Sequence, residues 1–154
     1  MPTKARAYIW PPIAMVKLKL DIAPDPELTI IGISSHEKDY RLCWALNKEF
    51  SIELGRTDDD VQLDEGDQHA AFAVFEHINE DEHLHVTLVN NRSTSGLLLK
   101  EQKLADYFLL LNQDAPIEAE DLLARVRRTP FVLTAFALDY HNLREGHKLL
   151  NRGE

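Results

Sequence analysis

The densest set of polar side chains in this sequence lies at residues 33–41, where hydroxyl, imidazole and carboxylate groups precede an amphipathic segment. Free backbone N–H groups at the start of a helix attract anions and polar groups, so we expect a binding site here. The predicted binding residues of this stretch are Ser35, His36, Asp39 and Arg41. A structural role is the alternative, because Ser34 and Glu37 fit a capping box and Asp39 suits a first helical turn.

Asp106 is the second candidate, since it places a carboxylate in the otherwise apolar residues 105–111. A buried charge must be paired or neutralised. We expect Arg41 to pair with Asp106 as a structural clamp between the first helix and this strand. The alternative is a proton-transferring acid with a raised pKa. Glu101 and Asp106 complete the predicted set of binding residues, and no residue is predicted to be catalytic.

Three histidines raise the question of a metal. His83 and His85 share one face of a predicted strand and His77 lies across the turn, so three imidazoles are available for zinc. An exposed polar hairpin end is the interpretation that we favour, because no HExxH motif and no cysteine pair accompanies them. We therefore predict no metal and no other cofactor.

The sequence contains no GxGxxG loop, P-loop or GxSxG motif. Its single cysteine, Cys43, falls inside a predicted helix, whereas a reactive thiol needs a helix N-terminus or a basic neighbour. We expect Cys43 to pack as a small hydrophobic residue. These observations disfavour nucleotide binding through a glycine loop and catalysis through a nucleophile elbow.

The acidic charge is concentrated in one stretch. Twenty-six acidic against 17 basic residues give a net charge of −9, which disfavours general attraction to nucleic acid or anionic membranes. Six of the acids fall in residues 58–67 without a base, and we predict a solvated loop or hairpin tip there. A cation-binding loop is the alternative, although the spacing departs from the calcium-loop pattern. A local basic end is formed by Arg125, Arg127 and Arg128.

Apolar periodicity predicts the elements that position these residues. We expect the first helix at 35–49 to bury Tyr40 and Trp44, with Trp44 as a core anchor. The predicted strands lie at 15–21, at 50–54, within a meander at 69–99, at 105–111 and at 132–138, and a second helix lies between Pro116 and Pro130, while the apolar residues 28–33 lead into the first helix. The order β-α-β-β-β-β-α-β predicts an α+β fold, a mostly antiparallel sheet with two main helices packed on it. Residues 105–138 could form a parallel crossover.

The domain organisation follows from the same patterns. Residues 1–14 contain three prolines and no apolar period, so we predict a dispensable N-terminal extension in which disorder and partial order both remain open. A single domain is predicted at 15–140 and a polar C-terminal tail at 141–154. No apolar run is long enough to span a membrane, and no signal-peptide stretch follows Lys4 and Arg6.

Two blocks of residues resemble the bacterial IPExxxVDY family. The first comprises residues 31–36 (IGISSH), residues 39–42 (DYRL) and Trp44. The second, residues 99–107 (LKEQKLADY), lies at the motif that names the family and matches it at Glu101, Asp106 and Tyr107. It departs at Leu99, Lys100 and Ala105. The family has no assigned activity, so the resemblance implies a bacterial cytoplasmic protein and no mechanism.

We therefore expect a small, cytoplasmic, non-enzymatic binding or adaptor protein whose partner is another protein, with no membrane partner. A cryptic enzyme with a polar site at residues 34–41 is one alternative. An RNA-associated factor is the other.

Overall fold

The structure, a computed structural model, describes residues 28–152. The predicted N-terminal extension and the predicted strand at 15–21 lie outside these residues. The longer elements are β2 (Leu28–Ser34), α1 (Asp39–Phe50), β4 (Val61–Glu65), β5 (Gln68–Phe72), β6 (Val74–Asn79), β7 (Leu84–Asn90), β10 (Tyr107–Asn112), α2 (Ala119–Arg127) and β11 (Thr134–Leu138). The short ones are β3 (Gly55–Arg56), β8 (Arg92–Ser93), β9 (Gly96–Leu97) and the 3₁₀ turns η1 (Glu80–Glu82), η2 (Tyr140–Asn142) and η3 (Gly146–Leu150).

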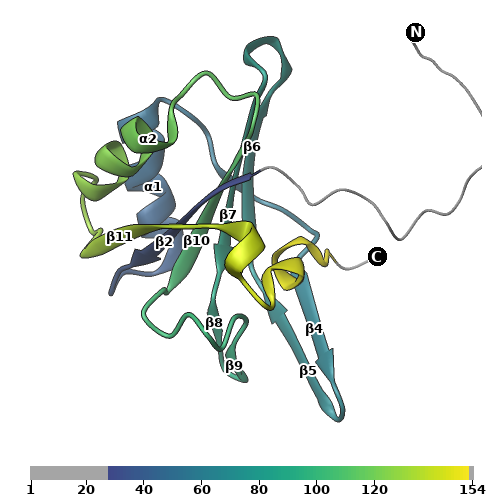
Figure 1. Ribbon diagram of the computed structural model, residues 1–154. Helices are drawn as coiled ribbons and strands as arrows, with labels where there is room; N and C mark the ends of the chain where they lie inside the picture. The colour runs from purple at the N-terminus through teal and green to yellow at the C-terminus, as the bar shows by residue number, and fades with distance from the viewer. Residues whose placement is uncertain (1–27, 153–154) are drawn as a thin grey trace, which may run out of the picture.

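Six strands form the main sheet in the order β11-β2-β10-β7-β6-β3, and every neighbouring pair is antiparallel (Figure 1). This confirms the predicted α+β fold. Since β2 lies between β10 and β11 and is antiparallel to both, β10 and β11 are parallel to each other. The connection through α2 is therefore the predicted parallel crossover, with β2 inserted between its two strands.

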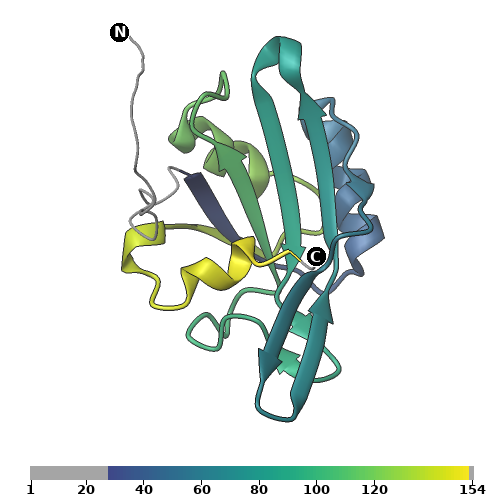
Figure 2. The ribbon, with the colours of Figure 1, turned by 90° about the vertical axis from the view of Figure 1, so that its right-hand side faces the viewer.

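The two faces of the sheet are covered by different parts of the chain. Both helices pack on one face, over a core that contains Leu42, Leu46, Leu88, Leu109 and Leu122. The opposite face buries Phe72, Phe108 and Leu110 beneath residues 139–152, whose Leu143 and Leu149 enter this second core (Figures 1 and 2). The central strand β10 is thus buried on both faces, as its apolar sequence predicts.

One predicted helix start and one predicted strand are wrong. Helix α1 begins at Asp39 rather than at residue 35, because residues 35–38 form a turn between β2 and the helix. No strand forms at 50–54; Phe50 ends the helix, and Ser51 takes a left-handed conformation with φ of 55° that reverses the chain. Phe50 lies at the helix end, and Ile52 and Leu54 lie in the irregular segment after it. All three pack in the helix-side core, and this gives the apolar alternation without a strand.

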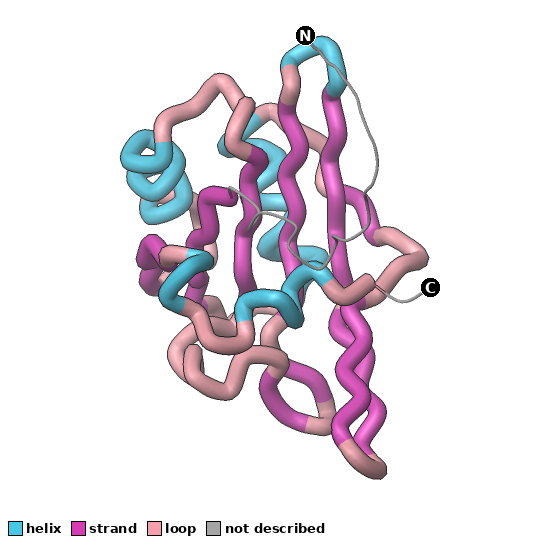
Figure 3. The backbone as a smooth tube through the Cα atoms, turned by 45° about the vertical axis from the view of Figure 1, so that its right-hand side comes forward, coloured by secondary structure: helices cyan, strands magenta, loops and turns pink. Residues whose placement is uncertain are grey.

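The second half of the acidic stretch forms a hairpin tip, as predicted, and residues 58–60 lie in the loop before it. Strands β4 and β5 pair from Val61↔Phe72 to Glu65↔Gln68, and Gly66 turns the chain at a φ of 61° (Figure 3). Asp64, Glu65 and Asp67 are exposed at its tip. Of the helices in residues 28–152, none has the length and apolar character needed to cross a bilayer.

Candidate functional site

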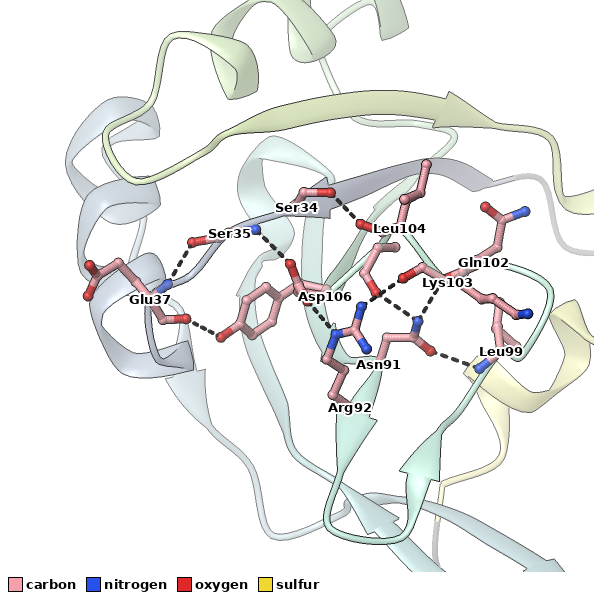
Figure 4. A network of polar contacts seen from close by, with 12 residues as sticks. Ser34, Ser35, Glu37, Asn91, Arg92, Leu99, Gln102, Lys103, Leu104 and Asp106 are labelled. Carbon is pink, nitrogen blue, oxygen red and sulfur yellow. Dashed lines mark hydrogen bonds and ion pairs between the residues drawn. The ribbon is translucent and has the colours of Figure 1, made fainter.

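Asp106, just before β10, is fixed by two contacts (Figure 4). Its Oδ2 accepts a hydrogen bond from the Ser35 backbone N–H at 2.8 Å, and its Oδ1 pairs with Arg92 Nε. The predicted clamp between Arg41 and Asp106 is therefore wrong, because Arg92 is the basic partner.

Strand alternation explains this difference. Consecutive residues of a strand point to opposite faces, so only one of Asp106 and Tyr107 can face the helices. Tyr107 does so, entering the helix-side core and donating its hydroxyl to the Glu37 carbonyl at 2.6 Å. Burial raises the pKa of this hydroxyl, so it stays protonated. Arg41 instead pairs with Glu37 at 3.3 Å and lies 5.0 Å from the centre of the Phe131 ring.

Residues 98–106, which include most of the stretch that resembles the family motif, are held by Asn91 and Arg92, which the sequence did not single out, and by Ser34, for which it predicted a capping role. Asn91 is completely buried. Its amide nitrogen donates to the carbonyls of Gln102 and Ala105, and its oxygen accepts from the Leu99 N–H (Figure 4). Arg92 Nη2 donates to the Lys103 carbonyl and Ser34 Oγ to that of Leu104. For Asn91 the sequence pattern indicated only its place within the predicted meander at 69–99.

The other predicted site residues do not all converge. Ser35 is 5% exposed, and its Oγ accepts from the Glu37 N–H at 3.1 Å. Asp39 accepts from Asn90 Nδ2 at 3.0 Å, and His36 lies exposed in the turn before α1. Glu101 does not join this group, because its carboxylate accepts from the Glu145 N–H and so fastens the C-terminal segment.

The predicted capping box is also wrong. Lys38 occupies the N-cap position of α1 and makes no side-chain cap hydrogen bond. Ser34 lies four residues earlier, at the end of β2, and its hydroxyl donates to the Leu104 carbonyl instead. The polar groups before α1 therefore join the helix start to the sheet.

The largest correction concerns the aromatic residues of α1. Tyr40 is 61% exposed and Trp44 is 56% exposed, whereas the buried residues of the helix are Leu42, Cys43, Ala45 and Leu46. The prediction that Trp44 anchors the core is thus wrong. Lys48 Nζ lies 4.6 Å from the centre of the Trp44 ring. We call the exposed set Tyr40, Arg41, Trp44 and Lys48 the α1 surface.

Cys43 packs in the helix-side core, as predicted, where burial and the nearby Asp39 carboxylate raise the pKa of its thiol to about 12. This thiol stays protonated at neutral pH and lacks the thiolate character that nucleophilic attack requires.

The three histidines separate in the fold. His77 Nδ1 accepts from the Glu53 N–H, His85 Nε2 contacts Glu76 Oε2 at 2.8 Å, and His83 takes a left-handed conformation outside the strand. Over residues 28–152, no group of three His, Cys, Asp or Glu side chains is placed to hold a metal ion.

Comparison with known proteins returned no matching family model, no matching curated protein and no matching solved structure. The resemblance described above therefore stays a prediction.

Proposed function

We propose that this chain is a non-enzymatic binding protein that holds a protein partner on the α1 surface. The observation that carries the proposal is the exposure of Tyr40 and Trp44, one helical turn apart, on a helix whose opposite side is locked into the core. Residues four apart lie on the same helix face, so the two rings offer adjacent apolar area.

The residue types support a protein interface. Trp, Tyr and Arg are enriched among residues that dominate binding energy, because they combine large contact area with a polar group. All three occur on the α1 surface. The helix presenting them is rigid, since Leu42 and Leu46 are almost completely buried on its inner side. A rigid surface loses less conformational entropy on binding than a flexible one.

The charges around these rings support a partner of defined chemistry. Lys38, Arg41 and Lys48 are exposed on or beside α1, and Arg41 is the one of them paired with a neighbouring carboxylate, Glu37, in the described part of the chain. Residues 37–49 carry as many acidic as basic side chains, but the acidic ones, Glu37, Asp39 and Glu49, are half-buried, so the exposed charges beside the rings are basic. Charge complementarity favours a partner segment with an apolar anchor flanked by carboxylates.

The polar network around Asp106 supports the same proposal because it holds the start of α1 in place. Its contacts with Ser35 and Arg92, together with the Tyr107–Glu37 bond, fix the turn that leads into α1. We place the protein in the cytoplasm and in the IPExxxVDY family as part of this proposal.

Photo-crosslinking in living cells tests the proposal. The photoreactive residue p-benzoylphenylalanine replaces Tyr40 in one strain and Ile78 in another. Ile78 is a matched control because it is 56% exposed, close to the 61% of Tyr40, but it lies near the end of β6. We expect a discrete protein adduct from position 40, absent from position 78 and lost when Trp44→Ala is added.

Three results would overturn the proposal. They are an adduct to RNA rather than protein, equal protein adducts from both positions, and no adduct from position 40 in cells that express the folded chain. The RNA result would favour the RNA-associated alternative, since exposed aromatic rings beside cations also stack bases.

A further inference from the structure

A hollow of about 200 Å³ lies between the two helices and the sheet, away from the α1 surface. Figure 1 shows α1 and α2 side by side on the sheet face where this hollow lies. Its floor is formed by Leu84, Val86, Leu109 and Leu111 of β7 and β10. Leu46, Phe50 and Ile52 come from α1 and its end, and Pro116, Ile117, Leu122 and Arg125 from α2 and the segment before it.

Ten of these eleven lining residues are apolar, and the deep ones belong to the helix-side core. Leu46, Leu109, Leu111 and Leu122 are each at most 2% exposed, so the walls are fixed by the fold. A dry cavity of roughly 150 Å³ lined by such side chains can hold a benzene molecule. The hollow therefore has room for one aromatic ring or a comparable branched alkyl group.

Arg125 supplies the charge at this hollow. Its guanidinium stacks 4.4 Å from the centre of the Phe50 ring. Nε approaches Glu49 Oε2 at 3.4 Å and Nη2 donates to the Glu49 carbonyl, while Nη1 bonds to no residue within 28–152.

The carboxylate of Glu49 is shared with Arg128, which approaches it at 2.9 Å. Two arginines thus face one carboxylate. The hydrogen bond from Arg128, aided by Arg125, lowers the pKa of Glu49, so the three groups carry a net charge of +1. A negative charge on a ligand would complete this balance.

We propose that the hollow binds a small organic carboxylate whose apolar body is a single aromatic ring or a short branched alkyl chain. The body fills the space above Leu109 and Leu111, and the carboxylate accepts from the free Nη1 of Arg125. This site is separate from the α1 surface, so it does not depend on the proposed protein partner.

The test uses 3-phenylpropionate as the probe and its uncharged analogue 3-phenylpropan-1-ol as a matched ligand, titrated into the full chain by two-dimensional NMR. We expect saturable shifts at residues lining the hollow for both, with tighter binding of the carboxylate. Arg125→Met should weaken the carboxylate about tenfold and leave the alcohol unchanged. Arg144→Met, a matched loss of an exposed arginine outside the hollow, should change neither.

Filling the hollow provides the second arm. Val86→Phe should abolish binding of both ligands. Ile117→Trp serves if Val86→Phe does not fold, because Ile117 is only partly buried at the edge of the core. The proposal is overturned if the carboxylate gives no saturable shifts, if it binds equally to the filled variants, or if Arg125→Met and Arg144→Met behave alike.

Discussion

Asp106 shows how one side chain fixes the geometry of the region before α1. It is partly buried, with its two carboxylate oxygens shared between Ser35 and Arg92. Loss of the carboxylate would leave the Ser35 N–H without its acceptor, and Ser35 is almost completely buried. A buried donor without a partner costs about 1–3 kcal/mol.

A double-mutant cycle separates the predicted partner of this carboxylate, Arg41, from the observed partner, Arg92. Asp106→Ala should lower the free energy of unfolding by about 1–3 kcal/mol, and Arg92→Ala by about 1 kcal/mol or less because Arg92 is half exposed. Urea unfolding should show a coupling above about 0.5 kcal/mol for Arg92 with Asp106. The cycle of Arg41→Ala with Asp106→Ala is the control, and it should be additive within about 0.3 kcal/mol. The reverse pattern would restore the clamp to Arg41.

The sequence identified Asp106 as a carboxylate that needs a partner, but the prediction named Arg41 as that partner and did not consider Arg92. The choice depends on which face Asp106 occupies, and that is set when Tyr107 turns toward the helices. Asn91 was missed for a similar reason, since a single asparagine in a turn carries no signal of three hydrogen bonds to residues 99–105.

Helix α1 combines a buried side and an exposed aromatic side. Both sides contain large apolar residues, so the sequence pattern allows two rotations of the helix about its axis. Leu42, Cys43 and Leu46 follow the spacing i, i+1, i+4 of one face, and these residues are buried. The prediction chose the other rotation because it counted Tyr40 and Trp44 as core residues.

Unfolding measurements distinguish the two rotations. Trp44→Ala should change the free energy of unfolding by less than about 1 kcal/mol, because the ring is mostly exposed. Leu46→Ala, on the buried side, should cost about 2–5 kcal/mol through loss of packing and a residual cavity. A Trp44→Ala cost as large as that of Leu46→Ala would mean that the indole is part of the core.

The C-terminal segment, residues 139–152, is packed on the sheet although its sequence shows no apolar period. Its polar sequence predicted a loose tail, yet Leu143 and Leu149 complete the second core. Lys148 pairs with Glu65 at 2.9 Å and Glu145 at 2.7 Å, and Arg152 approaches Glu76. Two leucines separated by five polar or small residues give no helical or strand period, so their burial depends on the sheet face that they cover.

Two adjacent leucines test this packing. Leu149 is 2% exposed and Leu150 is 44% exposed. Leu149→Ala should lower the free energy of unfolding by about 2–5 kcal/mol, and Leu150→Ala by less than about 1 kcal/mol. Equal small effects in urea unfolding would mean that the segment contributes little to the fold.

The attachment of the segment should also depend on pH. Burial alone would raise the pKa of Glu76, but hydrogen bonds from His85 and Arg152 outweigh it and bring the pKa below its usual 4.5. A carboxyl with a lowered folded pKa stabilises the fold above its unfolded pKa, and this contribution is lost as pH falls through the folded value. Wild-type stability should therefore fall more between pH 6 and about pH 3 than that of Glu76→Gln. The exposed control Glu120→Gln should follow the wild type, and identical slopes for Glu76→Gln and wild type would contradict the assignment.

The binding role of the α1 surface is tested most directly by titrating the purified cross-linked partner into the full chain. In a Trp10→Phe background, Trp44 is the remaining tryptophan. We predict that the partner shifts its emission to the blue and protects it from iodide. Affinity should fall by about tenfold or more in Trp44→Ala, as for a central interface residue, and stay within about twofold in Ile78→Ala. Unchanged Trp44 emission on saturation, or equal losses of affinity in Trp44→Ala and Ile78→Ala, would contradict the account.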